Sequence, residues 1–103
     1  MNPSIQKFTA LVQQHPANEM ARFSLGKALF DAADYTGALQ QFEVALQKRA
    51  DWMVVVILSG KAHLSLGDKA KARNCFERAL ELAIAQNHEG PREEMRLLLG
   101  ELA

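Results

Sequence analysis

The side chains that could perform chemistry in this chain of 103 residues are one cysteine, three histidines and scattered carboxylates. Catalysis by Cys75 requires a neighbouring base and a group that orients this base, and the sequence identifies neither. His15, His63 and His88 lie far apart and lack the paired spacing of metal ligands. The chain also has no phosphate-binding glycine loop and no G-x-S-x-G nucleophile elbow. We therefore expect no catalytic residue, no metal site, no cofactor and no enzymatic activity.

Each of these reactive side chains has a structural explanation. Cys75 is the only cysteine, so it cannot form an internal disulfide, and we expect it to pack half-buried on a helix. We interpret His15 as a helix-end residue and His63 as a packing residue between helices. Several carboxylates stand on predicted helical faces beside Lys or Arg, as solvated surface pairs do. They are Glu43, Glu77, Glu81, Glu93 and Glu94.

The composition argues against other classes of function. Lys plus Arg and Asp plus Glu both number 12, so the basic excess of a nucleic-acid-binding protein is missing. The longest apolar run, residues 52–58, is far shorter than a membrane span, and the N-terminus lacks the apolar stretch of a secretory signal. With 49% hydrophobic and 23% charged residues, the chain is expected to be globular. We expect a soluble, cytoplasmic protein that binds neither nucleic acid nor membranes.

An internal repeat of 34 residues organises the chain. When residues 19–52 are laid over residues 53–86, nine of the 34 pairs are identical. The identities gather at small and apolar residues, where packing constrains the choice. In the first repeat they are Gly26, Lys27, Ala28, Asp34, Ala38, Phe42, Glu43, Ala45 and Leu46. The pattern extends backwards by half a repeat, because Phe8 precedes Phe42 by the same 34 residues.

Each repeat predicts two helices separated by a short turn. Apolar residues recur at three- and four-residue steps on both sides of a break, which falls at Asp34 in the first repeat and at Gly67-Asp68 in the second. Gly67 can adopt the left-handed conformation that ends a helix. Asp68 can cap the next helix by accepting a hydrogen bond from a backbone N–H group.

The two ends of the chain predict single helices. Asn2 can cap a helix that has Pro3 in its first turn and that ends before Pro16. At the other end, residues 87–90 predict a turn, and Pro91 predicts the start of a last helix. The apolar stripe of this last helix consists of Met95, Leu98, Leu99 and Leu102. Because a repeat array needs an end that covers its last apolar face, we assign a capping role to this helix.

Gly26 and Gly60 stand in the middle of predicted helices, where glycine costs about 1 kcal/mol relative to alanine. A cost that recurs at the same place in both repeats indicates a benefit that also recurs. We expect two helix backbones to approach closely at each glycine, with Phe42 or Phe76 filling the space beside it.

These residues resemble the signature of the tetratricopeptide repeat family, which is W-x2-L-G-x2-Y, then A-x3-F, A and P, over about 34 residues. The first repeat supplies Leu25-Gly26, Ala38-x3-Phe42 and Ala45, and the second supplies Gly60, Ala72-x3-Phe76 and Ala79. Other signature positions differ, since Arg22 and Val56 stand in the Trp position, His63 in the Tyr position, and Ala50 and Ile84 in the Pro position. The resemblance covers residues 4–86.

The resemblance implies an all-α fold in which antiparallel helix hairpins stack as a short right-handed α-solenoid of about six helices. The corresponding organisation is a single domain, with a half repeat at 1–18, repeats at 19–52 and 53–86, and a C-terminal capping helix at 87–103. The family geometry also implies a concave groove that is lined by the first helix of each repeat. Proteins of this family generally act as binding scaffolds and adaptors and not as enzymes.

In this geometry one stripe of each first helix faces the groove. The stripe residues are Met20, Phe23, Lys27, Phe30 and Asp31 in the first repeat, and Val54, Ile57, Lys61, Leu64 and Ser65 in the second. The stripes are apolar, and each has a lysine at the same place, so we predict that the groove binds an apolar peptide or helix of another protein. An acidic group of this ligand would lie near Lys27 and Lys61.

Two alternatives stay open from the sequence. Packing between neighbouring first helices would explain the apolar stripe residues, and simple solvation would explain the lysines. The apolar run of residues 52–58 would point in every direction on a helix, so part of it must meet a neighbouring helix, a ligand or a second subunit. The alternative function is therefore self-association as a homodimer, with no foreign ligand in the groove.

One subgroup of this family binds the acidic C-termini of heat-shock chaperones through a clamp of Lys and Asn side chains. Phe23 and Leu58 stand at two of the places where the clamp would need Lys and Asn. Lys27 stands at a third place, where Asn is expected. The clamp is thus absent from the sequence, and we do not predict a chaperone tail as the partner.

Overall fold

The computed structural model describes residues 2–103, which form six α-helices and no strand. The helices are α1 (Pro3–Gln14), α2 (Glu19–Asp31), α3 (Tyr35–Lys48), α4 (Met53–Ser65), α5 (Lys69–Ala85) and α6 (Glu89–Leu102). The predicted all-α fold is confirmed. The chain divides into two compact units, of which the first extends to Ala50 and the second covers Asp51–Ala103. The single-domain organisation stays a prediction.

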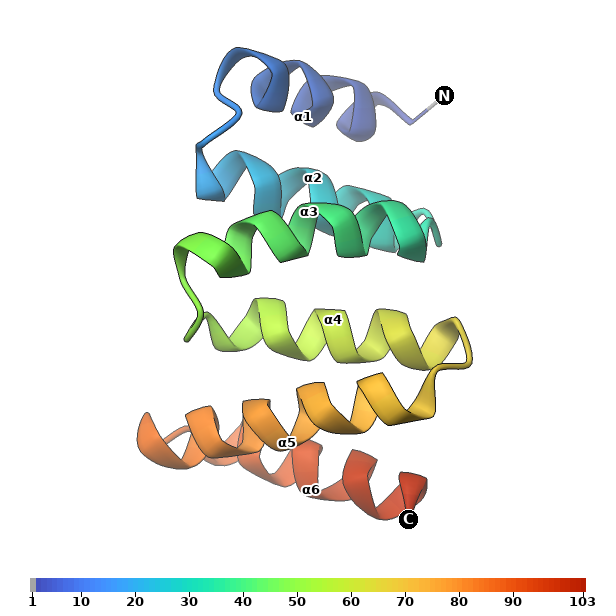
Figure 1. The fold of residues 1–103 in the computed structure, drawn as a ribbon, viewed down its shortest axis with the longest axis vertical. Coiled ribbons are helices and arrows are strands. Elements are labelled where there is room, and N and C mark those ends of the chain that lie inside the picture. Colours follow the sequence, from blue (N-terminus) through green and yellow to red (C-terminus); the bar gives the residue numbers. More distant parts are fainter. Residues whose placement is uncertain (1) are drawn as a thin grey trace. The chain divides into compact units, whose positions relative to one another are not determined.

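The first unit consists of α1, α2 and α3, in which α2 runs antiparallel to both neighbours and packs against each of them (Figure 1). Asn2 and Asn18 cap the first two helices, because their side-chain oxygens accept hydrogen bonds from Ser4 N at 2.8 Å and from Met20 N at 2.9 Å. The apolar core between α1 and α2 comprises Val12, Ala21 and Leu25 with Ile5, Phe8, Leu11 and Leu29 packed around them.

The second unit consists of α4, α5 and α6, and α5 packs antiparallel against both of the others (Figure 1). The sequence predicted the start of α6 at Pro91, but the helix begins two residues earlier, at Glu89. Proline is tolerated in a first helical turn because the N–H groups there have no intrahelical acceptor. Met95 is fully buried, so α6 packs by the apolar stripe that the sequence predicted.

The apolar run of residues 52–58 forms most of α4, although β-branched residues are mediocre helix formers. Five consecutive residues, Val55 to Ser59, are buried, and only Val54 of the run is exposed. Most of the apolar surface of this run is therefore buried in the structure.

The two glycines of the repeat occupy equivalent places in two helix hairpins. A Cβ atom on Gly26 would lie 2.5 Å from Cε1 of Phe42, and a Cβ atom on Gly60 would lie 2.5 Å from Cε1 of Phe76. Both phenylalanines are completely buried. The prediction that phenylalanine fills the space beside each glycine is confirmed. Residues 34 positions apart thus make the same packing contact in the two hairpins.

The turn inside each hairpin also repeats. Asp34 N donates to the carbonyl of Leu29 at 2.8 Å, and Asp68 N donates to the carbonyl of His63 at 2.9 Å. Gly67 adopts the predicted left-handed conformation, with φ of +83°, and Ala33 holds the same position in the first repeat with φ of +63°. Asp68 accepts the predicted capping bond, from Lys71 N at 3.1 Å.

Candidate functional site

The reactive side chains of the described residues form no cluster of metal-binding groups. Among residues 2–103 there is no group of three or more His, Cys, Asp or Glu that could hold a metal ion. Cys75 is half-buried, and burial raises the pKa of its thiol. A raised pKa disfavours the nucleophilic thiolate. No helix in this part of the chain is long and apolar enough to cross a bilayer.

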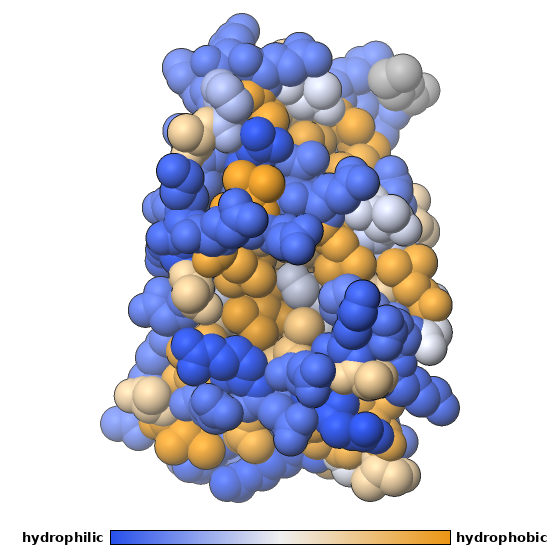
Figure 2. All heavy atoms as spheres, viewed as in Figure 1, coloured by the Kyte–Doolittle hydropathy of each residue, from blue (hydrophilic) through white to orange (hydrophobic). Residues whose placement is uncertain are grey.

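The predicted stripe of α2 presents a partly exposed apolar face. Met20 is 52% exposed, and Phe23 and Phe30 are half-buried. The ring of Phe30 packs edge-on against Tyr35 at a centroid distance of 5.4 Å, so part of its role is to hold the turn between α2 and α3. In each unit, hydrophobic side chains reach the surface among hydrophilic ones (Figure 2).

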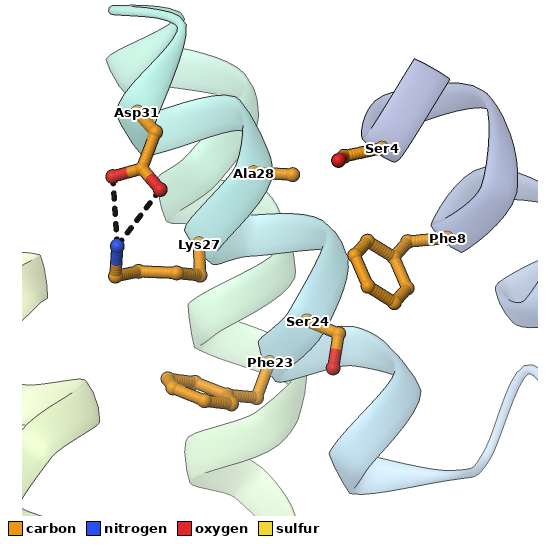
Figure 3. A pocket seen from close by; sticks show the side chains of 7 residues that line it. All are labelled: Ser4, Phe8, Phe23, Ser24, Lys27, Ala28 and Asp31. Atoms are coloured by element: carbon orange, nitrogen blue, oxygen red, sulfur yellow. Dashed lines mark hydrogen bonds and ion pairs between the residues drawn. The ribbon is translucent and has the colours of Figure 1, made fainter. Parts of the chain in front are cut away.

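A pocket of about 230 Å³ lies between α1 and α2 in the first unit. Its lining residues are Ser4 and Phe8 from α1, and Phe23, Ser24, Lys27, Ala28 and Asp31 from α2. Figure 3 shows Ser4 and Phe8 extending from α1 toward α2, and Ser24 and Ala28 lying on the side of α2 that faces them. Phe23, Lys27 and Asp31 project from the other side of α2. The structure thus brings three predicted stripe residues into one pocket.

The sequence did not predict the other four lining residues of this pocket. The stripe was drawn along one helix face, whereas the pocket wall includes a second face of α2 and side chains from α1. The 34-residue register contained a usable signal, because it aligns Phe8 with Phe42 and therefore places Phe8 on the side of α1 that packs against another helix.

The two stripe lysines are both paired with carboxylates. The Nζ atom of Lys27 lies 2.8 Å from each carboxylate oxygen of Asp31, one helical turn further along α2. The Nζ atom of Lys61 lies 2.8 Å from Oε2 of Glu94, which comes from α6. Asp31 aligns with Ser65 in the 34-residue register, so the second repeat has no carboxylate at the local position. There α6 supplies the negative charge instead.

The predicted stripe of α4 has less accessible apolar surface than the stripe of α2. Val54 is 43% exposed, whereas Ile57 is only 7% exposed. Leu64 and Lys61 are half-buried. Ile57 therefore has little exposed surface in this structure, and the alternative that it packs between helices stays open.

Comparison with known proteins places the chain in a family. Two family models described as tetratricopeptide repeat match residues 4–52 and 57–84. A TPR repeat-containing protein of Pseudomonas aeruginosa, PA0015, is 31% identical over 85 residues, which cover 82% of this chain and 81% of that protein. The Hsp70-Hsp90 organizing protein of Triticum aestivum is 32% identical over 75 residues, but these cover only 13% of its length.

Solved structures have the same fold. PcrH in complex with the chaperone binding region of PopD is 24% identical, with a TM-score of 0.87 over 95% of this chain and 74% of that one. Protein BPP2914 from Bordetella parapertussis is 26% identical, with a TM-score of 0.84 over 99% of this chain and 89% of that one. The repeated glycine–phenylalanine packing, the family models and the bacterial relative agree, and the chain belongs to the tetratricopeptide repeat family.

Proposed function

We propose that this protein is an interaction module that binds an apolar peptide or helix of another protein. The observation that carries the proposal is the α1–α2 pocket, which joins the exposed apolar face of α2 and contains Phe23. Exposed apolar surface bordered by polar groups is typical of interaction sites. The related structures fit this proposal, because PcrH was solved with a segment of PopD and a tetratricopeptide domain of Spaghetti with an HSP90 peptide.

The proposed contact residues are those of the two first-helix faces. They are Met20, Phe23, Lys27 and Phe30 on α2, and Val54, Ile57, Lys61 and Leu64 on α4. We rank the α2 residues first, because Met20 is 52% exposed and Ile57 is 7% exposed. An acidic group of the ligand would have to compete with Asp31 for Lys27 or with Glu94 for Lys61. Apolar contacts should therefore dominate the affinity.

We do not propose a chaperone tail as the ligand, because the sequence lacks the Lys and Asn side chains of the clamp that binds such tails. Phe23 stands at one of those positions, as described above. An enzymatic role is not proposed either, because proteins of this family generally act as binding modules and because burial raises the pKa of the Cys75 thiol, which disfavours its nucleophilic form. A cytoplasmic location stays a prediction from the sequence.

Selection from a phage-displayed library of random peptides tests the proposal, with the full chain as the immobilised target. Two variants form a matched pair, because Met20 on α2 and Ile84 on α5 are 52% and 53% exposed. We expect Met20→Ser to weaken binding of a selected peptide about tenfold and Ile84→Ser to leave it unchanged. Both variants should keep the circular dichroism spectrum of the wild type, because neither side chain is buried.

Failure to select any peptide, or equal losses of affinity in the two variants, would contradict the proposal. The alternative function, self-association as a homodimer, makes a different prediction. Under this alternative, the mass in solution would be that of a dimer, and Met20→Ser would convert it to a monomer. Sedimentation equilibrium of the wild type and the two variants separates these outcomes.

A further inference from the structure

The α1–α2 pocket is lined by a small residue, Ser24, at a register position where the second repeat has a leucine. In the 34-residue register Ser24 aligns with Leu58, while Ala28 aligns with Ala62 and Lys27 with Lys61. Leu58 is 9% exposed, so this register position accepts a buried leucine side chain in the second repeat. In the first repeat the same position ends at a hydroxyl group, and the pocket opens beside it.

The walls of the pocket suit an aliphatic group. Phe8 and Phe23 supply aromatic surface from two different helices, and Ala28 on α2 faces Ser4 on α1 (Figure 3). The volume of about 230 Å³ is below the range of roughly 300–1,000 Å³ that is typical of pockets for cofactors and drug-sized molecules. The pocket therefore has room for one side chain of a larger ligand rather than for a complete small molecule.

The polar groups at the pocket suit an uncharged ligand that has amide groups. The side chains of Ser4 and Ser24 make no hydrogen bond to any other described residue, and a hydroxyl can both donate and accept. The charges of Lys27 and Asp31 neutralise each other at 2.8 Å. A ligand carboxylate would gain little at this neutral pair, whereas a peptide backbone could use the two hydroxyls.

We propose that the pocket binds a single leucine-sized aliphatic side chain of a partner peptide, with the flanking peptide amides at Ser4 and Ser24. The inserted side chain would take the place that the absent leucine leaves at position 24. This inference rests on the proposed function as a peptide-binding module and specifies its anchor residue.

The test is a titration of the ¹⁵N-labelled full chain with N-acetylleucinamide, followed by NMR. We expect saturable shifts of amide signals from the pocket residues, with a dissociation constant on the order of a few millimolar for a ligand of about twelve heavy atoms. N-acetylalaninamide should bind at least about fivefold more weakly, because it buries fewer methyl and methylene groups. N-acetylglutamate α-amide, which keeps a charged side-chain carboxylate, should cause no saturable shifts at these residues.

Two serine variants provide the matched comparison. Ser24→Leu should abolish the shifts, since the new side chain fills the pocket in the way that the register allows in the second repeat. Ser65→Leu makes the same change at an exposed position of α4 and should leave the titration unchanged. A measurement that needs no variant is the nuclear Overhauser effect between the methyl protons of the probe and the ring protons of Phe8 and Phe23.

The inference is overturned if N-acetylleucinamide gives no saturable shifts at the pocket, if the alanine or glutamate probe binds there equally well, or if Ser24→Leu folds and retains binding. These results are distinct from failure of the proposed function. If N-acetylleucinamide does not bind the pocket but a selected peptide still binds in a way that depends on Met20, only the pocket inference is refuted. Binding of the probe without selection of any peptide would support the pocket as an aliphatic site and refute the proposed function.

Discussion

Replacing Gly26 with alanine should destabilise the protein, although the same change usually stabilises a helix. The new Cβ atom would lie 2.5 Å from Cε1 and 2.7 Å from Cδ1 of Phe42, and 3.3 Å from the carbonyl oxygen of Ala38. Favourable contacts between carbon atoms lie at about 3.5–4.0 Å. Because the Phe42 ring is completely buried, either the ring or the backbone of α2 must move by about 1 Å to relieve the overlap.

The magnitude follows from two opposing terms. Overpacking of a filled core costs about 1–3 kcal/mol, whereas alanine improves the helix propensity over glycine by about 1 kcal/mol. We therefore expect Gly26→Ala to lower the free energy of unfolding by about 1 kcal/mol. Gly100→Ala is the control, because no atom lies within 4 Å of its added Cβ. Close to the end of α6, this change should raise the free energy of unfolding by up to about 0.5 kcal/mol.

Urea unfolding followed by circular dichroism measures both effects. With an m-value of about 1–1.5 kcal/mol per molar urea, Gly26→Ala should shift the midpoint down by about 0.7–1 M and Gly100→Ala slightly up. A double-mutant cycle with Phe42→Leu should return a coupling energy of at least about 0.5 kcal/mol, since the smaller side chain relieves the overlap. An increase of the midpoint in Gly26→Ala would refute the close-approach explanation of the repeated glycines.

Two further predictions concern a turn and the thiol. Ala33 has φ of +63° where the other repeat has Gly67 with φ of +83°. Ala33→Gly should therefore raise the free energy of unfolding by about 0.5–1 kcal/mol, and Gly67→Ala should lower it by about 1 kcal/mol. Urea midpoints of the two variants that move in the same direction would contradict this. Burial raises the pKa of the Cys75 thiol, so at pH 8 the folded chain has a smaller thiolate fraction than the unfolded chain. Alkylation by iodoacetamide at that pH should be several-fold slower in the folded chain than in urea, and equal rates would be evidence against burial.

The parts of the fold that the sequence predicted are those fixed by short-range packing. A glycine and a phenylalanine sixteen residues apart, at Gly26 and Phe42 and again at Gly60 and Phe76, recur because the helices of one hairpin meet at one point. Such a contact depends only on residues within one hairpin, so a repeat in the sequence reveals it. The start of α6 was misplaced by two residues because a proline in the first turn marks a helix start only approximately.

The features that the sequence did not predict depend on contacts between side chains whose spacing in the sequence follows no repeat. Glu94 reaches Lys61 because α6 packs against α5 in the second unit, and no spacing rule connects residues 61 and 94. The pocket likewise depends on how closely α1 approaches α2, since Ser4 and Phe8 contribute to its lining. The length of the side chains and the distance between the helices determine both the ion pair and the pocket. Neither can be predicted from the pattern of residues along a single helix.

The two repeats share the glycine–phenylalanine contact inside each hairpin but differ at other positions of their first helices. The phenylalanine that fills the hairpin is the same in both repeats, but Phe23 aligns with Ile57 and Ser24 with Leu58. Even the shared lysine obtains its counter-charge from a different helix in each unit. The pocket beside Ser24 and the partly exposed Phe23 are thus features of α2 that α4, with buried Leu58 and Ile57 at the same register positions, does not share.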